Sequence, residues 1–439
     1  MTNARLKSRL MDSRPVAVDL FSGVGGMSLG LELAGFFSAV HVEVEAETSR
    51  YAEYNFPLAA HLAGEKGDVR SLSGSRLRDL VDGREISVIA GGPPCQGFSR
   101  AGRRRVDDPL NDLVLEMARI VMEVRPQAFV IENVPGSLSD QYWQFGKAVE
   151  ILEDQYSVSP PTTLRAEEFG VPQIRRRVFT VGIRRDLGTK PFLPVPTHVS
   201  PTEDLDPLFG VVCPVVGDAI MDLPDPDDYD HLFDADSVEY TSDPKSAYAT
   251  QMRLVGGLAA QRGYAVDWDE RICTNLRRTH HGPDLTARLT RLEQGRTDPS
   301  SRIPRLSLTG LSPTIRAGTT SDRGSWSAPR PCHPVFPRVI TTREAARLQS
   351  FPDWFRFHPV KWHGNRQVGN AVPPLLARAV GTALIEALSL NSETGLLGTA
   401  RRDEELIGSD LAAASTAGYG QRRPSHKVVN TGAAARKSS

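Results

Sequence analysis

The first half of the chain alternates short apolar runs with helical patterns, and this alternation is the strongest constraint on its fold. The apolar runs are rich in β-branched residues and are four to six residues long. Between them, apolar residues recur at helical spacing, as Leu113, Met117 and Val121 do. This order is typical of parallel βαβ units, so we expect an α/β fold with a doubly wound, Rossmann-like sheet. The expected strands span residues 16–20, 39–44, 86–90, 128–131 and 178–183.

Composition excludes several classes of protein. The chain has 439 residues, a formal net charge of −1 and 40% hydrophobic residues, which suits a globular protein of two or three domains. No apolar run approaches about 18 residues, and the N-terminal segment lacks the apolar core of a signal peptide, so neither a membrane helix nor secretion is expected. The four scattered cysteines form no Cys-x-x-Cys motif. We therefore expect a cytoplasmic protein with no disulfide framework and no metal site.

The composition and periodicity of the chain change after Gly188. Pro, Asp, Ser and Gly become frequent and helical periodicity is lost until about residue 335, whereas helical patterns return at 341–350 and 373–390. The last residues are rich in Ala, Ser, Gly and Arg and hold few large apolar side chains, a composition typical of disorder. We expect the first domain to span 1–185 and to be completed by 339–395, with a second, irregular domain at 186–338 and a disordered tail at 396–439.

A glycine-rich turn, residues 19–26, follows the first expected strand. Glycines at this point let the backbone approach a bound nucleotide closely. A dinucleotide fingerprint needs Gly or Ala at position 28, but Ser28 is there, so the turn suits a nucleoside that lacks a pyrophosphate. Phe21 could pack on a purine ring, Glu43 ends the next strand where a carboxylate can bind ribose hydroxyls, and Asp68 could accept from an exocyclic amine.

The segment 91–99 reads Gly-Gly-Pro-Pro-Cys-Gln-Gly-Phe-Ser and follows a buried-strand pattern. It places Cys95 at the carboxyl edge of a parallel sheet, where such folds bind ligands. A thiol on this turn is a candidate nucleophile, because its glycine-rich, polar neighbours do not describe a core. The alternative, a buried inert cysteine, fits Cys213 better, since that residue lies among valines.

Charged residues follow the next two strands. Glu132 ends the strand beside that of Cys95, and adjacent strands lie about 5 Å apart, so a carboxyl group and a nucleophile are expected together. Such a pair can attack one atom of a ring while protonating another. Gln173, Arg175 and Arg177 alternate and should share one face of a strand. They are either a solvated charge run or a clamp on phosphate or on the carboxylate of the site.

The order of these motifs resembles the DNA (cytosine-5)-methyltransferases of bacterial restriction-modification systems. The resemblance covers about residues 15–185 and 340–390, and residues 217–224 look like the family's lead-in to its target-recognition region. One departure is Arg165, where the family usually has Asn. The matching blocks are 19–26, Glu43, 93–96, 132–134, the Gln173/Arg175/Arg177 trio, 343–352 and 367–374.

The resemblance implies a mechanism and a set of site residues. Cys95 would attack C6 of a cytosine flipped out of duplex DNA, and Glu132 would hold its N3 and amino edge. S-adenosyl-L-methionine would methylate C5, with Arg175 and Arg177 supporting the site. The enzyme would act as a monomer in the cytoplasm, associated with the nucleoid through DNA. The implied cofactor residues are Asp19, Phe21, Gly23, Gly25, Glu43, Val44, Asp68, Val69, Gly91, Asn370 and Ala371, and the implied substrate and DNA residues are Pro93, Gln96, Ser99, Gln173, Arg277, Arg278, Arg316 and Arg323.

Charge is distributed unevenly within the second domain, the implied target-recognition domain. Residues 199–270 hold 16 acidic and 3 basic side chains, whereas residues 271–330 hold 4 acidic and 11 basic ones. Arginine can neutralise phosphate and form hydrogen bonds to guanine edges, so we expect the base-reading side chains within 271–330. Within this range, the loop 318–327 is the first candidate. The alternative is that these arginines pair with the acidic stretch and never meet DNA.

Three other functions compete with this interpretation. A catalytically dead DNA-binding paralogue is disfavoured by the intact Cys95, Glu132 and Arg175, and an RNA cytosine methyltransferase is disfavoured by the long second domain. A nicotinamide oxidoreductase is disfavoured by Ser28 and by Cys95. In the favoured fold, the last helix, after Pro373, returns to pack beside the first strand.

Overall fold

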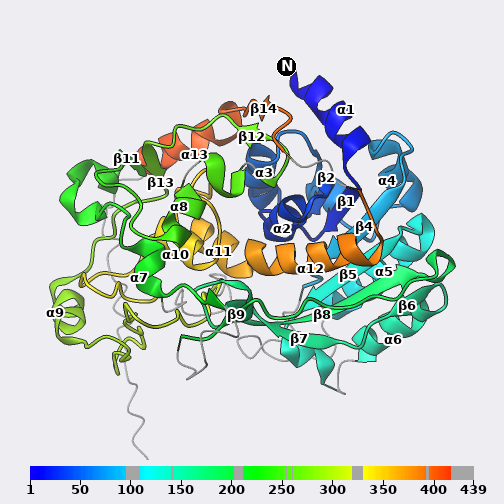
Figure 1. Ribbon diagram of the computed structural model, residues 1–439. Helices are drawn as coiled ribbons and strands as arrows, with labels where there is room; N and C mark the ends of the chain where they lie inside the picture. The colour runs from blue at the N-terminus through cyan, green and yellow to red at the C-terminus, as the bar shows by residue number, and fades with distance from the viewer. Residues whose placement is uncertain are drawn as a thin grey trace, which may run out of the picture.

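A mixed sheet of eight strands lies at the centre of the protein (Figure 1). The computed structural model describes residues 1–94, 109–139, 143–201, 211–253, 255–259, 261–318, 330–391 and 395–416. The strand order is β3-β2-β1-β4-β5-β8-β6, and β7 also pairs with β8. The strands are β1 (Val16–Leu20), β2 (Phe37–Glu43), β3 (Ala60–Ala63), β4 (Ile86–Gly91), β5 (Ala128–Asn133), β6 (Tyr156–Val158), β7 (Thr162–Arg165) and β8 (Arg176–Arg184).

The predicted α/β sheet is confirmed, and all five expected strands are present. Strands β1 to β5 are mutually parallel, whereas β8 runs antiparallel to β5 and to the two short strands beside it. The prediction missed β3, β6 and β7. These strands are only three or four residues long and partly exposed, so they carry no continuous apolar run.

Helices cover both faces of the sheet. The chain first moves outward from β1 to β3 and then returns, because β4 pairs with β1. Right-handed crossovers therefore place the helices before and after this reversal on opposite faces. Helices α2 (Gly26–Ala34) and α3 (Ala46–Asn55) belong to one face, and the mutually contacting α4 (Gly74–Leu80), α5 (Leu113–Val124) and α6 (Trp143–Glu153) to the other.

The helix expected after Pro373 is α12 (Pro374–Ala387), and it packs on α2 rather than directly beside β1 (Figure 1). Glycines bring the two helices close together. A Cβ on Gly30 would lie 2.3 Å from the Cβ of Ala377, and one on Gly381 would lie 2.7 Å from the Cβ of Ala34. The C-terminal part of the fold thus reaches the sheet through α2.

One stretch of the described residues, 361–387, is long and apolar enough to span a membrane, although the sequence was expected to hold none. It comprises two helices, α11 (Lys361–Asn370) and α12, with a break before Pro374. In its most apolar window 67% of the residues are buried inside the protein. This stretch is therefore a pair of core helices.

The expected second domain, 186–338, is built from small clusters and is not separate from the main core. Leu232, Cys273 and Leu276 form one buried cluster, and a second surrounds Leu289. By contrast, Tyr248, Met252 and Tyr264 belong to the main core. The elements of this segment include α7 (Val216–Ile220), β11 (Ser237–Glu239), α8 (Ala247–Arg253), β12 (Ala265–Val266), β13 (Ile272–Thr274) and α9 (Pro283–Arg291), followed by α10 (Thr342–Leu348).

The described part of the tail is ordered and docked, contrary to the expectation of disorder from residue 396. Strand β14 (Thr399–Ala400) pairs with β12, and α13 (Glu405–Thr416) packs on α3 (Figure 1). Arg402 is buried and donates to the backbone oxygen of Trp354 at 2.7 Å. The composition of the tail could not predict this docking, because the tail packs on surfaces formed by other segments of the chain. Residues 417–439 lie outside the described residues.

Deletion of residues 395–439 is expected to lower the melting temperature. It would uncover the Trp354 and Tyr54 side chains, over which the Arg402 guanidinium lies. Each newly exposed aromatic side chain costs about 1.5–3 kcal/mol, so the melting temperature should fall by roughly 5 °C or more. Calorimetry of the full chain, of this deletion and of a deletion of 417–439, which removes none of these contacts, checks the result. An unchanged melting temperature would show that the docking adds nothing to stability.

Candidate active site

A cavity of about 600 Å³ opens at the carboxyl ends of β1 and β4. The chain direction reverses between these two strands, and in open α/β sheets the crevice at such a reversal is where ligands bind. The volume is in the range of small-molecule sites. Of the predicted residues, the cavity is lined by Asp19, Phe21, Gly23, Glu43, Val44, Asp68, Val69, Pro93, Glu132, Arg177, Asn370 and Ala371, but not by Gly25 or Gly91.

The glycine turn is shaped by steric contacts and by Asp19. Gly25 has φ +99°, and a Cβ there would lie 2.3 Å from the Phe56 ring, so only glycine fits. Gly25 is also the N-cap of α2 and offers no side chain. Asp19 replaces the missing cap, since its Oδ2 accepts from the backbone N of Ser28 at 3.1 Å and from Ser28 Oγ at 2.5 Å. Burial raises the pKa of Asp19 to about 7, despite these bonds.

Glu43 lies on the cavity wall with its carboxylate already oriented. Oε2 accepts from the backbone N of Gly23 at 2.9 Å, and Oε1 accepts from that of Glu45 at 2.8 Å. Burial raises the pKa of Glu43. A carboxylate has about four lone-pair sites, so each oxygen can still accept from a ligand hydroxyl.

Val44 and Asp68 are two cavity residues that are accessible to solvent. Val44 is 59% exposed, which leaves an apolar surface at the cavity for a flat ring. Asp68 forms a bidentate pair with Arg70, whose Nη2 lies 2.6 Å from Oδ2, and this pair lowers the pKa of Asp68. An exocyclic amine would therefore share Asp68 with Arg70.

Glu132 is held in one orientation at the end of β5. Arg177 Nε donates to its Oε1 at 2.9 Å, and a Cβ on Gly92 would lie 2.7 Å from its Oε2, so the carboxyl group occupies the space that a side chain at 92 would need. Burial raises the pKa of Glu132, although the charges of Arg177 and Arg175 oppose the rise. Cys95, Gln96 and Ser99 lie outside the described residues, but the adjoining Pro93 and Pro94 line the cavity beside Glu132.

Gln173, predicted to contact the substrate or DNA, and Arg175, predicted to support the site, both bind protein groups in the structure. Gln173 Nε2 donates to Gln349 Oε1 at 2.6 Å, and its Oε1 accepts from the backbone N of Ile315. Arg175 is fully buried and donates to the backbone oxygens of Gly369 at 2.8 Å and Ala371 at 3.0 Å. Gln173 and Arg175 precede β8, and the third residue of the trio, Arg177, pairs with Glu132. Arg175 therefore positions the 369–371 segment that lines the cavity.

Two of the arginines predicted to contact DNA also bind protein groups in the structure. Arg277 is buried, and its Nε donates to the backbone oxygen of Phe233 at 3.1 Å. Arg278 pairs with Asp227 at 3.0 Å and Asp230 at 2.9 Å, both in the acidic stretch. All of these partners belong to residues 199–270, and contact with that stretch was the alternative to DNA contact.

A third arginine predicted to contact DNA, Arg316, remains a candidate for that role. It is exposed, and the backbone beside it packs so closely on α11 that a Cβ on Gly369 would lie 2.4 Å from the backbone N of Ala317. Arg316 therefore lies at the border between the second domain and the cavity. Arg323 and residues 319–327 of the expected reading loop lie outside the described residues.

Several cavity residues escaped the sequence interpretation, among them Glu45, Thr48, His363 and Arg366. Arg366 pairs with Glu45 Oε1 at 2.5 Å, which joins the start of α3 to α11 across the cavity. The one available signal was that Arg366 directly precedes the 367–374 block. No local pattern connects positions 45 and 366.

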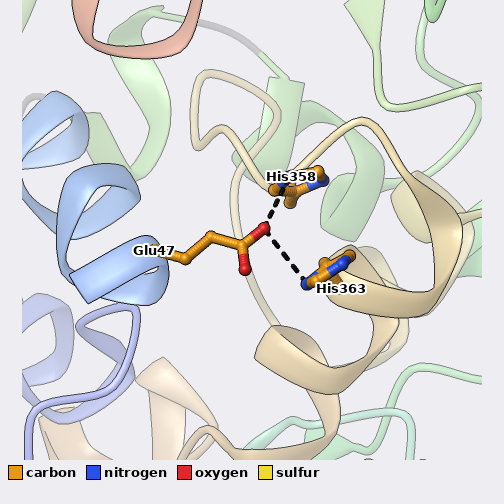
Figure 2. A group of neighbouring side chains, drawn as sticks. All are labelled: Glu47, His358 and His363. Atoms are coloured by element: carbon orange, nitrogen blue, oxygen red, sulfur yellow. Dashed lines mark ion pairs between the residues drawn. The ribbon is translucent and has the colours of Figure 1, made fainter. Parts of the chain in front are cut away.

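One side-chain group in the described part of the chain has the composition of a metal site. Glu47 lies between His358 Nε2 at 2.8 Å and His363 Nδ1 at 3.1 Å (Figure 2). However, His358 Nδ1 accepts from the backbone N of Val360 at 3.0 Å. The neutral ring then carries its hydrogen on Nε2, the atom that a metal would need as a free ligand. The geometry therefore fits a hydrogen-bonded cluster in which His358 donates to Glu47.

Comparisons with known proteins agree with the fold and the cavity. The family model described as C-5 cytosine-specific DNA methylase matches residues 16–386. The type II methyltransferase M.XorII of Xanthomonas oryzae pv. oryzae is 40% identical over 92% of each chain, and M.AgeI of Thalassovita gelatinovora is 33% identical over 85% of this chain and 99% of its own. A solved structure of a candidate DNA modification methyltransferase from an E. coli prophage is 33% identical, with a TM-score of 0.70 over 86% of this chain and all of the other.

The matched region contains the sheet, the cavity and most of both segments that are predicted to form the first domain. It spans residues 186–338 as well, and the two relatives match 92% and 85% of the chain. The chain therefore belongs to the C-5 cytosine-specific DNA methylase family, and its activity is the methylation of cytosine at C5 in DNA.

Proposed function

We propose that the cavity binds S-adenosyl-L-methionine, the methyl donor that membership of this family implies. Besides Glu132, which is proposed to act on the cytosine, four carboxyl groups line the cavity, and they suit a ligand with a sulfonium and an ammonium charge. They are those of Asp19, Glu43, Glu45 and Asp68. Glu43 offers acceptors for ribose hydroxyls, and Phe21 and Val44 offer apolar surface for the adenine. The described cavity thus fits the cofactor in size, charge and polarity.

The proposed substrate is a cytosine flipped out of duplex DNA, because a base stacked inside a duplex cannot enter a cavity at the carboxyl ends of the strands. The Cys95 thiolate adds to C6, and Glu132 donates a hydrogen bond to N3, which stabilises the negative charge that reaches the ring. When bound, S-adenosyl-L-methionine supplies an electrophilic methyl group on sulfur. Loss of the C5 proton to a base and departure of the Cys95 thiolate then yield 5-methylcytosine, S-adenosylhomocysteine and a proton.

The position of Glu132 is the observation that carries this mechanism. Its carboxyl group is buried at the cavity and paired with Arg177, and Pro93 and Pro94, which precede Cys95 in the sequence, line the same cavity. The raised pKa of Glu132 favours the protonated form that donates to N3. Bisulfite sequencing of DNA from cells that express the protein tests the function, since it reports the modified base and its sequence context together. Absence of new 5-methylcytosine would overturn the proposal.

We propose that the outer part of 186–338 is the target-recognition domain. The support is the exposed position of Arg316 beside the cavity, next to the expected reading loop. The biological role that fits a sequence-specific enzyme of this family is protection of host DNA in a restriction-modification system, by a cytoplasmic protein.

Cofactor affinity is expected to increase with pH through the ionisation of Asp19. The pKa of this group is about 7 in the cofactor-free protein, and a bound cation lowers it, so binding releases a proton near neutral pH. The dissociation constant for S-adenosyl-L-methionine should therefore fall about fivefold between pH 6 and pH 8. Equilibrium dialysis across this range measures the effect. In Asp19→Asn the dependence should flatten, whereas Asp79→Asn, an exposed change on α4, should retain it.

A further inference from the structure

The C-terminal helix α13 lies beyond residue 386, where the family match ends, yet it contacts the structure around the cofactor cavity. Its neighbour is α3, the helix that follows the cavity residue Glu43. Glu45 and Thr48, at the start of α3, line the cavity themselves. A segment outside the family match is therefore one helix away from the cofactor site.

One face of α3 is bound by α13, and by Glu404 just before it, through charged and hydroxyl groups. Asp410 Oδ2 accepts from Arg50 Nη2 at 2.9 Å and from the Tyr51 hydroxyl at 3.0 Å. One turn further along, the Tyr54 hydroxyl donates to Glu404 Oε1 at 2.6 Å. The Asp410 side chain is only 16% exposed, so these bonds are shielded from water.

The start of α3 is bound by α11, which supplies another wall of the cavity. Arg366 pairs with Glu45, and Thr48 Oγ1 donates to Glu45 Oε2 at 2.7 Å. Glu47 contacts His363, a cavity residue on α11 (Figure 2). Helix α3 is thus held between α13 on one side and the cavity wall on the other.

His358 links the two sides directly. Its Nε2 lies 2.8 Å from Glu47 Oε1 and 3.7 Å from Asp410 Oδ2, so the ring lies between a residue of α3 and one of α13. Its ring also stacks on that of His363, with centroids 4.6 Å apart. A continuous series of polar contacts therefore runs from Asp410 through His358 and Glu47 to His363.

We propose that Asp410 is a positioning residue for cofactor binding. It holds α3 and His358 in place, and these in turn keep Glu45, Thr48 and His363 at the cavity wall. The proposal rests on the proposed binding of S-adenosyl-L-methionine in this cavity. It assigns to the docked tail a role in substrate affinity, in addition to stability.

The test compares Asp410→Asn with Glu405→Gln in the full-length chain. Both changes remove one charge from α13, but Glu405 is exposed in its first turn. Asp410→Asn should raise the KM and the dissociation constant for S-adenosyl-L-methionine about fivefold or more, the usual scale of coupling between sites. The rate at saturating cofactor should stay within about twofold of the parent, and Glu405→Gln should leave all of these values unchanged.

Tyr51→Phe provides a second variant, since it removes one bond to Asp410 and keeps the ring. It should weaken cofactor binding in the same direction even if Asp410→Asn folds poorly. A lower melting temperature with unchanged cofactor affinity in both variants would overturn the proposal, because it would limit the contact to stability. An equal loss of affinity in Glu405→Gln would also overturn it. Glu43→Gln is measured in the same assay. If neither Glu43→Gln nor the Asp410 and Tyr51 variants change cofactor affinity, the cofactor site itself is misplaced. If Glu43→Gln weakens binding and the other variants do not, only the role of Asp410 fails.

Discussion

Cys95→Ser is expected to abolish methyl transfer while binding of duplex DNA persists. In the proposed mechanism a thiolate is the attacking group, and a serine hydroxyl is far less nucleophilic at neutral pH. The single-turnover rate should fall on the order of 10⁴-fold or more, as when other enzymes lose their nucleophile. Transfer of a labelled methyl group measures the rate, and fluorescence anisotropy with a cognate duplex measures binding. Turnover comparable to that of the parent would exclude the covalent mechanism.

The remaining cysteines provide matched controls, because the structure places all three in the interior. Burial raises the pKa of Cys213 and Cys273 to about 12 and that of Cys332 to about 11. Their thiols therefore stay protonated at neutral pH and are poor nucleophiles. Each should tolerate replacement by alanine with methyl transfer largely retained. Loss of the chemical step in any of these variants, with the fold intact, would point to a second essential thiol and contradict the mechanism.

Glu132→Gln is expected to slow the chemical step by about 10²–10⁴-fold, the usual contribution of a positioned acid or base. Glutamine keeps the shape of the side chain and an acceptor for Arg177, but it cannot take the ionised and protonated forms of a carboxyl group. The dissociation constant for S-adenosyl-L-methionine should change little, because the carboxyl group is proposed to act on the cytosine ring. Single-turnover rates at saturating cofactor and DNA, together with cofactor titration, separate the two effects.

The opposite pattern would reassign Glu132. If the rate at saturation is unchanged and cofactor binding is weakened, the carboxyl group belongs to the proposed cofactor site, together with Asp19 and Glu43. Glu43→Gln is the matched control, since it removes a second buried carboxylate from the same cavity. It should weaken cofactor binding more than it slows the chemical step.

Local patterns in the sequence were sufficient to locate the sheet and the turns at its edge. The predicted strand 16–20 coincides with β1, because a β-branched run that stops at a glycine turn can be recognised from neighbouring residues alone. Ser28 excluded a dinucleotide turn, and in the structure it binds Asp19. Since the carboxyl ends of parallel strands meet at one edge, the same patterns also brought Asp19, Glu43 and Glu132 to one cavity. The strands β3, β6 and β7 escaped because so few half-exposed residues carry no periodic signal.

Contacts between distant segments were decided only by the tertiary structure. The alternation of Gln173 and Arg175 predicted a shared face, but only the tertiary structure shows that both side chains bind protein groups, at Ile315, Gly369 and Ala371. Charge composition could not choose between a phosphate and the aspartates that pair with Arg278, since either partner neutralises a guanidinium. The composition of the tail indicates how little that segment can bury by itself. Its docking depends on surfaces of α3 and Trp354 that exist only after the rest of the chain has folded.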